Sequence, residues 1–360
     1  MRCFVTGATG RLGSVLVKAL LDRHHFVTAL VTDENERMKL PKGAEAIVGD
    51  ITDRAAVEKG VGECQVVFHL AALVSYTASW EQLERVNIKG TRTVADACSK
   101  HKTRLIYVST TGVYGKRLAE MPANEKTPTN PTDLYGKSKL EAERIVGSYF
   151  GTFPYMIFRP AVIYGPPFFD VYARVLKKIE NGSMQVLGDG KNVIPFVHSD
   201  DVVEALMLGA RSELPAGTFV LAGNSTMTQE AIYRFAAEAL GVEFKPGHTS
   251  PGVAKALISL TSLVKKSGIS DEDVNVLSSH RIFDTNRAEK ILGWKPGTNL
   301  MEGIRQMVEM YNERKSRIAK IQEMRKLKEQ GQKPQRPVAS GKPGESDDHM
   351  GEINGNVKQD

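Results

Sequence analysis

The fold of this chain is decided by Thr6-Gly7-Ala8-Thr9-Gly10-Arg11-Leu12-Gly13, which follows a short apolar run and precedes apolar residues at helical spacing. In such a turn the first glycine allows a tight bend, the second lets the backbone approach a pyrophosphate, and the third lets the helix pack closely on the strand. Free N–H groups and the helix dipole favour negative charge at that end of the helix. The stretch therefore predicts a dinucleotide-binding turn.

Short apolar runs and helical patterns alternate through the first half of the chain. Runs rich in β-branched residues suit strands that are covered on both faces, and their alternation with helices predicts a parallel sheet. The expected fold class is α/β, with a Rossmann-type doubly wound parallel sheet, a smaller C-terminal α+β substrate-binding region and a disordered tail. The expected strands are Cys3–Val5, Val27–Val31, Ala46–Val48, Val66–Leu70, Leu105–Ser109 and Met156–Phe158, and the expected helices are 12–22, 54–60, 83–100 and 135–149.

The domain organisation follows changes in this pattern after Arg159-Pro160. We expect Val193–His198 to form a strand and Ser199 to cap the next helix. A last helical pattern begins near Leu300 and becomes strongly charged, and the residues beyond it hold too few apolar side chains to fold. The predicted parts are a dinucleotide-binding Rossmann domain (1–160, to which 193–211 return), a mainly substrate-binding region (161–310), a basic helix extension (311–330) and a disordered tail (331–360).

The positive charge of the chain is concentrated near its C-terminus. The formal net charge is +6, of which residues 314–342 carry +8, residues 343–360 carry −4, and the rest +2. We therefore expect no nucleic acid partner for the folded body. A solvated helix end with a disordered tail is the preferred interpretation of the basic segment, and contact with an anionic surface is the alternative.

Cysteine content and hydropathy bear on the compartment. The chain has three cysteines, far apart, which form neither a disulfide framework nor a metal-ligand spacing, so we expect no metal site. We find no N-terminal signal pattern, and no apolar run approaches the ~18 residues of a membrane span. These features predict a cytoplasmic location. The cysteines are Cys3, Cys64 and Cys98.

Tyr135-Gly136-Lys137-Ser138-Lys139 carries the candidate chemistry. Tyr135 and Lys139 share a helix face because they are four residues apart, whereas Lys137 is on another face. A nearby ammonium and an oxidised nicotinamide favour the phenolate and lower the pKa of the tyrosine, which can then take an alcohol proton as hydride leaves for the cofactor. The same pair would also suit an exposed helix face. The glycine turn and the hydroxyls of Ser109-Thr110-Thr111 favour catalysis.

The sequence leaves the form of the dinucleotide open. NAD sites usually place an acid about 20 residues after the glycine turn, at the end of the second strand, where it binds the ribose 2′-hydroxyl. Asp33 follows that strand slightly late and is equally well interpreted as a ribose ligand or as an exposed loop acid. No arginine stands at the strand end, although Arg37 and Lys39 are near.

Over roughly 1–310 the sequence resembles an extended short-chain dehydrogenase/reductase of the NAD-dependent epimerase/dehydratase family. The motifs together are specific for the family and say little about the substrate. They are Thr6–Gly13, Gly49-Asp50-Ile51, His69–Ala72, Asn87, Ser109–Gly115, Tyr135–Lys139, Arg159-Pro160, Tyr164-Gly165-Pro166, Phe196–Asp201 and Gly293–Pro296.

The resemblance implies a role for each matching residue. Tyr135 would be the general acid/base, Lys139 would also hold the nicotinamide ribose, and Thr110 would supply the catalytic hydroxyl, with Ser109 as the runner-up. The acid usual at the end of the second strand falls on Val31, a departure that weakens a strict NAD preference. The implied catalytic residues are Tyr135, Lys139 and Thr110, and the implied cofactor-binding residues are Gly7, Thr9, Gly10, Arg11, Leu12, Gly13, Asp33, Asp50, Ile51, Ala71, Ala72, Asn87, Tyr135, Lys139 and Pro160.

Two departures from the family pattern narrow the reaction. Dehydratases carry an Asp-Glu pair where this chain has Thr111-Gly112, so dehydration is disfavoured. Nucleotide-sugar epimerases commonly carry an arginine before the Phe-Val-His segment, where this chain has the more apolar run Lys191–Phe196. The second departure resembles the 3β-hydroxysteroid dehydrogenase and dihydroflavonol reductase branch.

These observations lead to a first hypothesis and two alternatives. We expect an NAD- or NADP-dependent oxidoreductase that acts on a secondary alcohol or ketone of a fairly apolar small molecule. The first alternative is a nucleotide-sugar 4-epimerase. The second is a non-catalytic dinucleotide-binding protein, although the presence of Tyr135, Lys139 and Thr110 argues against it. The resemblance also implies a homodimer that pairs the helices near 83–100 and 135–149 in a four-helix bundle.

Overall fold

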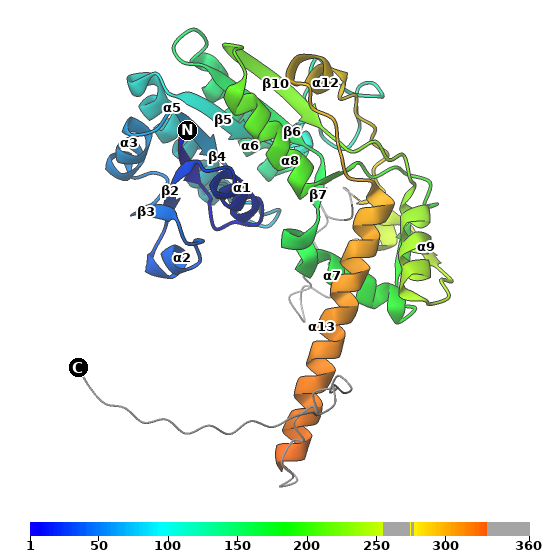
Figure 1. The fold of residues 1–360 in the computed structure, drawn as a ribbon. Coiled ribbons are helices and arrows are strands. Elements are labelled where there is room, and N and C mark those ends of the chain that lie inside the picture. The colour runs from blue at the N-terminus through cyan, green and yellow to red at the C-terminus, as the bar shows by residue number, and fades with distance from the viewer. Residues whose placement is uncertain (255–273, 275–276, 330–360) are drawn as a thin grey trace, which may run out of the picture. The chain divides into compact units, whose positions relative to one another are not determined.

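A computed structural model describes residues 1–254, 274 and 277–329 of the chain. Its centre is a sheet of seven strands in the order β10-β6-β5-β4-β1-β2-β3, with every neighbouring pair parallel (Figure 1). This order confirms the predicted Rossmann-type sheet. The strands are β1 (Arg2–Thr6), β2 (Phe26–Val31), β3 (Ala44–Val48), β4 (Val66–His69), β5 (Arg104–Val108), β6 (Tyr155–Pro160) and β10 (Ala216–Leu221).

Helices cover both faces of the sheet because its strands alternate their side chains between two apolar cores. In β1, Cys3 and Val5 enter one core and Phe4 enters the other. The first core packs under α1 (Arg11–Asp22) and α8 (Ser199–Arg211). The helices of the second core are α3 (Arg54–Gly62), α5 (Gly90–His101) and α6 (Leu134–Ser148).

The helix expected at 83–100 is not continuous α-helix. It begins as α4 (Trp80–Leu83), passes through the π-helical segment η1 (Glu84–Lys89) and continues as α5. A π-helical turn carries an extra residue, and such turns are frequent at functional sites. Here the turn contains the buried side chain of Asn87.

Beyond β6 the chain builds a smaller α+β region with an apolar core of its own. Two short parallel pairs, β7 with β9 and β8 with β11, stand beside the main helices of this region. Tyr164, Leu176, Ile232 and Met307 meet in its core. The elements are β7 (Val162–Tyr164), α7 (Phe169–Glu180), β8 (Gln185–Leu187), β9 (Phe196–His198), α9 (Gln229–Leu240), β11 (Gly247–Thr249), α12 (Asn286–Leu292) and α13 (Leu300–Glu329).

Two local predictions need correction at β9. Only Phe196–His198 of the expected strand is paired with β7, because Val193 forms an isolated bridge with Thr228 instead. The N-cap of α8 is His198 rather than Ser199, and its Nδ1 accepts a hydrogen bond from the backbone N–H of Asp200 at 3.3 Å. β9 ends at His198, as expected, but α8 already begins at Ser199, so the residue in the N-cap position is the histidine.

The chain divides into two compact units, Met1–Asn312 and Glu313–Asp360. The first contains both the parallel sheet and the α+β region, and a domain boundary near residue 160 therefore stays a prediction. In the second, α13 continues to Glu329, as expected for the basic extension. The predicted tail at 331–360 lies outside the described residues. Among the helices of the described residues, none is long and apolar enough to cross a membrane.

Trp294 anchors the segment after α12 to α8. Its indole is 1% exposed within the first core, and its Nε1 donates to the backbone carbonyl of Asp201 at 2.7 Å. The carboxylate of Asp201 accepts in turn from the N–H groups of Gly297 and Thr298 at 2.9 and 3.2 Å. The C-terminal part of the first unit is held on the sheet through this contact.

We expect Trp294→Phe to lower the free energy of unfolding by about 2–3 kcal/mol, because it removes a buried hydrogen bond and leaves a cavity. Trp80→Phe, the same change at a partly exposed tryptophan, should cost less than about 1 kcal/mol. Urea denaturation followed by circular dichroism measures both. Equal losses for the two variants would contradict the anchoring role of Trp294.

Candidate active site

A cavity of about 820 Å³ lies at the carboxyl ends of the strands of the main sheet and extends to α7. Ligands of open α/β sheets bind at this edge. Every residue predicted from the sequence for cofactor or catalysis lines the cavity, except Asp33 and Asn87. Sites predicted from separate motifs are thus brought together, and the individual roles of these residues stay proposals.

The glycine turn between β1 and α1 leaves room only for backbone. Gly7 has a φ of +69°, and a Cβ on it would stand 2.7 Å from the backbone nitrogen of Ala71. A Cβ on Gly13 would stand 1.9 Å from the carbonyl oxygen of Gly7. No side chain caps the first turn of α1, and that turn contains no acid. The free N–H groups therefore fit a pyrophosphate, as the sequence predicts.

A chain of buried hydrogen bonds braces the segment that faces this turn. Thr6 Oγ1 accepts from the N–H of Ala71 at 3.2 Å and lies 2.7 Å from His69 Nδ1. His69 Nε2 lies 2.9 Å from Thr91 Oγ1, which donates to the carbonyl of Asn87. The Thr91 hydroxyl uses its one proton on the carbonyl of Asn87, so His69 Nε2 must donate to Thr91 Oγ1, and Nδ1 accepts from Thr6 Oγ1. The imidazole is therefore neutral, with its hydrogen on Nε2. Burial, followed by nearby Lys139, lowers the pKa of His69 to about 3, which keeps it neutral.

The far end of the cavity differs from the expectation for the ribose. Asp33 caps the short helix α2 (Glu34–Met38), where its carboxylate accepts from the N–H of Glu36 at 2.9 Å, and it does not line the cavity. Thr32 and Glu36 line it instead. Glu36 was not predicted from the sequence, because an acid that caps a helix and an exposed acid look alike until the backbone is known. Asp50, near the same end, is held by Arg85 at 2.7 Å.

Tyr135 and Lys139 lie on the buried face of α6, 8% and 2% exposed. The Lys139 Nζ donates to the carbonyl of Val108 at 2.8 Å and stands 4.3 Å from the centre of the Tyr107 ring. Burial lowers the pKa of Lys139 to about 7 against the opposing effect of Glu143. Lys137 is exposed, as expected.

The pKa of Tyr135 departs from the expected direction. Burial raises it, with further contributions from Tyr76 and Asp133, so in the protein by itself the phenol is protonated at neutral pH. The lowering expected from the sequence also required the positive charge of an oxidised nicotinamide, which acts only in the loaded enzyme, and burial dominates in the protein by itself. A buried, protonated phenol is suited to donating a proton.

Asn87 braces the site from behind although it does not line the cavity. Its Oδ1 accepts from the N–H of Leu73 at 2.7 Å, and its Nδ2 donates to the carbonyl of Leu73 and to Ser138 Oγ at 3.2 and 2.9 Å. The segment that carries Tyr76 is thereby tied to α6. Tyr76 meets the Tyr135 ring edge to face at 5.9 Å. Support of the site by Asn87 from the next helix stays a prediction, and these hydrogen bonds are the contacts through which it would act.

The two candidate hydroxyls after β5 have different partners. Ser109 Oγ donates to Glu143 at 2.5 Å, and the same carboxylate receives Arg159 Nε at 2.9 Å and Nη2 at 2.5 Å. Thr110 lines the cavity, and its Oγ1 accepts only the N–H of Gly112 at 3.0 Å among the hydrogen bonds found for its side chain. Because that bond leaves the hydroxyl proton of Thr110 available, the geometry favours Thr110 over Ser109 as the residue that meets a substrate oxygen.

The outer part of the cavity is mostly apolar. Arg11, whose guanidinium stands 5.8 Å from the centre of the Phe168 ring, Lys116 and Arg281 add positive charge there. Arg281, 4% exposed, was not predicted from the sequence. Lys191, the charged residue that begins the run Lys191–Phe196, is not among the lining residues. The apolar lining residues of this part are Val74, Phe168, Val171, Tyr172, Val175, Phe196 and Leu277.

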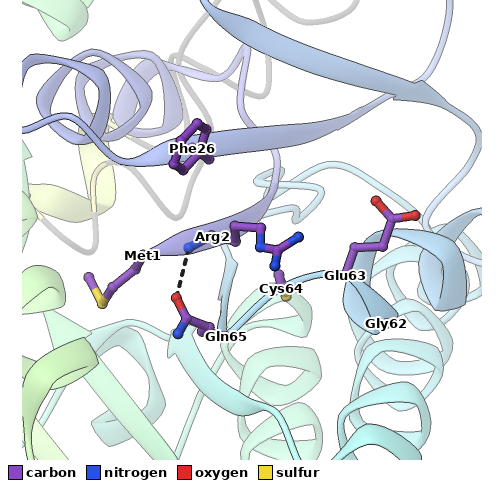
Figure 2. A pocket seen from close by; sticks show the side chains of 7 residues that line it. All are labelled: Met1, Arg2, Phe26, Gly62, Glu63, Cys64 and Gln65. Carbon is purple, nitrogen blue, oxygen red and sulfur yellow. Dashed lines mark hydrogen bonds between the residues drawn. The ribbon is translucent and has the colours of Figure 1, made fainter.

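A second pocket, of about 430 Å³, lies at the opposite end of the sheet, where β1 and β2 begin. Figure 2 shows its lining, in which the Arg2 N–H donates to Gln65 Oε1 at 3.0 Å. Glu63 and the largely exposed ring of Phe26 also line this pocket. None of the predicted site residues lies there, and we assign no role to this pocket.

Comparison with known proteins agrees with this geometry. The model of the NAD dependent epimerase/dehydratase family matches residues 3–222. The chain belongs to this family. It is therefore an enzyme that uses a nicotinamide dinucleotide, and its relatives include both reductases and nucleotide-sugar epimerases.

Three curated relatives of this family member illustrate that range. A 4-hydroxy-2-methyl-3-oxo-4-farnesyl-3,4-dihydroquinoline-1-oxide ketoreductase of Stigmatella aurantiaca is 28% identical, over 72% of this chain and 79% of its own. A 2-alkyl-3-oxoalkanoate reductase of Stenotrophomonas maltophilia is 24% identical, over 85% and 98%. A UDP-glucose 4-epimerase of Mycolicibacterium smegmatis is 28% identical, over 86% and 98%.

Solved structures of the family share the fold. MoeE5 in complex with UDP-glucose and NAD aligns with a TM-score of 0.70 and 25% identity, over 88% of this chain and 99% of its own. The UDP-glucose 4-epimerase of Thermotoga maritima aligns with a TM-score of 0.71 and 24% identity, over 87% and 99%. The smaller α+β region is thus part of the common architecture.

The pKa of Lys139 leads to a prediction about stability. Below about pH 7 the lysine is protonated in both the folded and unfolded chain, whereas between about 7 and its ordinary value of 10.5 only the unfolded chain holds the proton. The free energy of unfolding of the wild type relative to Lys139→Met should therefore rise over this range, by at most about 1.4 kcal/mol per pH unit. Urea denaturation from pH 6 to 10 measures it.

Lys137→Met is the matched control, since the exposed lysine of the same helix should give a difference that is flat with pH. A flat difference for Lys139→Met as well would show that the ammonium is not desolvated in the fold.

Proposed function

We propose that this enzyme reduces a ketone of an amphipathic, largely apolar small molecule to a secondary alcohol, with Tyr135 as the general acid. The observation that carries the proposal is a buried, protonated Tyr135 beside Lys139, at the junction of the dinucleotide cavity and an apolar chamber. When bound, a reduced nicotinamide supplies the hydride. Relatives named as a ketoreductase and as a 3-oxoalkanoate reductase support the choice of reaction.

The protein's own groups divide the work as follows. Tyr135 donates its phenolic proton to the ketone oxygen as the carbonyl carbon is reduced. Thr110 donates a hydrogen bond to the same oxygen, where negative charge develops. Lys139, anchored on Val108, holds the cofactor ribose and supports the phenolate left on Tyr135. The apolar walls exclude water from this proton transfer.

The proposal is tested with 2-alkyl-3-oxoalkanoic acids and simple long-chain ketones as substrates, in the presence of NADH or NADPH. Consumption of the reduced cofactor should require the ketone, and Tyr135→Phe should lower kcat by a factor of about 10²–10⁴ while the variant still binds the reduced cofactor. Tyr149→Phe, at the exposed end of the same helix, is the control. Full turnover by Tyr135→Phe would refute the assignment.

Substitutions at Thr110 and Ser109, the two hydroxyl residues after β5, should differ in whether they mainly affect turnover or stability. We expect Thr110→Val to lower kcat about a hundredfold, because it removes a donor to the reacting oxygen. It should also cost about 1 kcal/mol of stability, because the Gly112 N–H loses its acceptor. Ser109→Ala should instead lower the free energy of unfolding by about 1–2 kcal/mol, because Glu143 loses a buried donor. Parallel kinetics and urea denaturation distinguish them, and a larger kinetic effect at Ser109 would reverse the assignment.

A nucleotide-sugar 4-epimerase is the second candidate, and the relative from Mycolicibacterium smegmatis favours it. Epimerisation oxidises and re-reduces one carbon, so it consumes no cofactor. Interconversion of UDP-glucose and UDP-galactose without net change in the nicotinamide absorbance would establish this alternative. The apolar outer cavity and the position of Lys191 outside it argue for the reductase. The homodimer and the cytoplasmic location stay predictions from the sequence.

A further inference from the structure

The adenosine end of the cavity decides between NAD and NADP, which differ only by a phosphate on the ribose 2′-oxygen. Three lining residues matter there, namely Thr32 at the end of β2, Glu36 on α2, and Thr9 in the glycine turn. Asp33 is turned away into the cap of α2. Glu36 is therefore the acid of α2 that faces the cavity.

Glu36 is held in this position from two sides. Its carboxylate forms an ion pair with Lys39 one turn later on α2, and the side chain of Thr9 in the glycine turn is near enough to stabilise its ionised form. These two partners, Lys39 first, lower the pKa of Glu36, so it is ionised at neutral pH. The side chain keeps 26% of its surface exposed, on the side where the cavity opens.

The cations near this end are engaged with other groups. Arg37 pairs with Glu34 at 3.4 Å, and Lys39 pairs with Glu36 itself. Arg11 points to the other end of the cavity, where its guanidinium stands 5.8 Å from the centre of the Phe168 ring. At the strand end, where an NADP site can place an arginine, this chain has Thr32.

We propose that Glu36 takes the part of the acid missing from the end of β2 and makes this enzyme selective for NAD over NADP. A carboxylate accepts the hydrogen bond of a ribose hydroxyl, and the same carboxylate repels a 2′-phosphate, which brings close to two negative charges. The inference deepens the proposed function and rests on the dinucleotide site at its centre. It also explains how the chain can bind NAD although Val31 departs from the family pattern.

The test is a direct titration of the full-length protein with NADH and with NADPH, followed by the fluorescence of the reduced nicotinamide and requiring no substrate. The wild type should bind NADH at least about tenfold more tightly than NADPH. Glu36→Gln should bind NADH roughly tenfold more weakly, because the ribose hydroxyl loses a charged acceptor. The same variant should bind NADPH more tightly, because the repulsion of the 2′-phosphate is removed. A further Thr32→Arg in that variant should strengthen NADPH binding again.

Glu34→Gln is the matched control, since it removes the same charge from the same helix at a side chain outside the cavity. Its ratio of NADH to NADPH affinity should match the wild type. A wild type that prefers NADPH, or a Glu36→Gln variant with an unchanged ratio, would overturn the proposal. If Tyr135→Phe kept full turnover, that result would count against the proposed catalysis only, because the ratio of NADH to NADPH affinity is measured without substrate. Circular dichroism verifies that each variant is folded.

Discussion

The carboxylate of Glu143 joins α6, which carries Tyr135 and Lys139, to the ends of β5 and β6. It lies one turn beyond Lys139 on α6, 6% exposed, and receives hydrogen bonds from Ser109 after β5 and from Arg159 on β6. Arg159 extends the network to Tyr114, whose hydroxyl lies 2.7 Å from its Nη1. Removing one partner of such a buried pair leaves an uncompensated charge and typically costs about 3–5 kcal/mol. The position of α6 against the strand ends, and so of Tyr135 and Lys139, depends on this ion pair.

The same burial that positions the catalytic pair also sets its chemistry. A phenol and an ammonium taken out of water both shift towards their neutral forms, which is why the pKa of Tyr135 rises and that of Lys139 falls to about 7. The protein therefore presents a proton donor before any cofactor charge acts on it. The two ends of the cavity also differ in polarity, with polar backbone at the glycine turn and apolar side chains towards α7. A dinucleotide and an apolar ketone fit these two ends.

Prediction from sequence succeeded where a residue's role depends on local geometry. The turn at Gly7 and Gly13 needs no distant partner to be recognised, because steric limits on the backbone act within a few residues. It left a choice open, or chose the wrong neighbour, where residues close in space compete for one role. Asp33 and Glu36 are both acidic residues near the end of β2. Because Asp33 caps α2, Glu36 is the one that lines the cavity. Ser199 lost the N-cap to His198 for the same kind of reason.

The sequence by itself determined the α/β class, the dinucleotide turn and the pairing of Tyr135 with Lys139, since periodicity and short-range sterics are written into consecutive residues. Ser109 and Thr110 both line the cavity, and the tertiary structure alone decided that the hydroxyl proton of Ser109 is used on Glu143. It also decided that Arg281 joins a site formed mostly by the first half of the chain. These outcomes depend on contacts between residues far apart in the chain. Burial, hydrogen-bond competition and desolvation arise only when the packed fold brings such residues together.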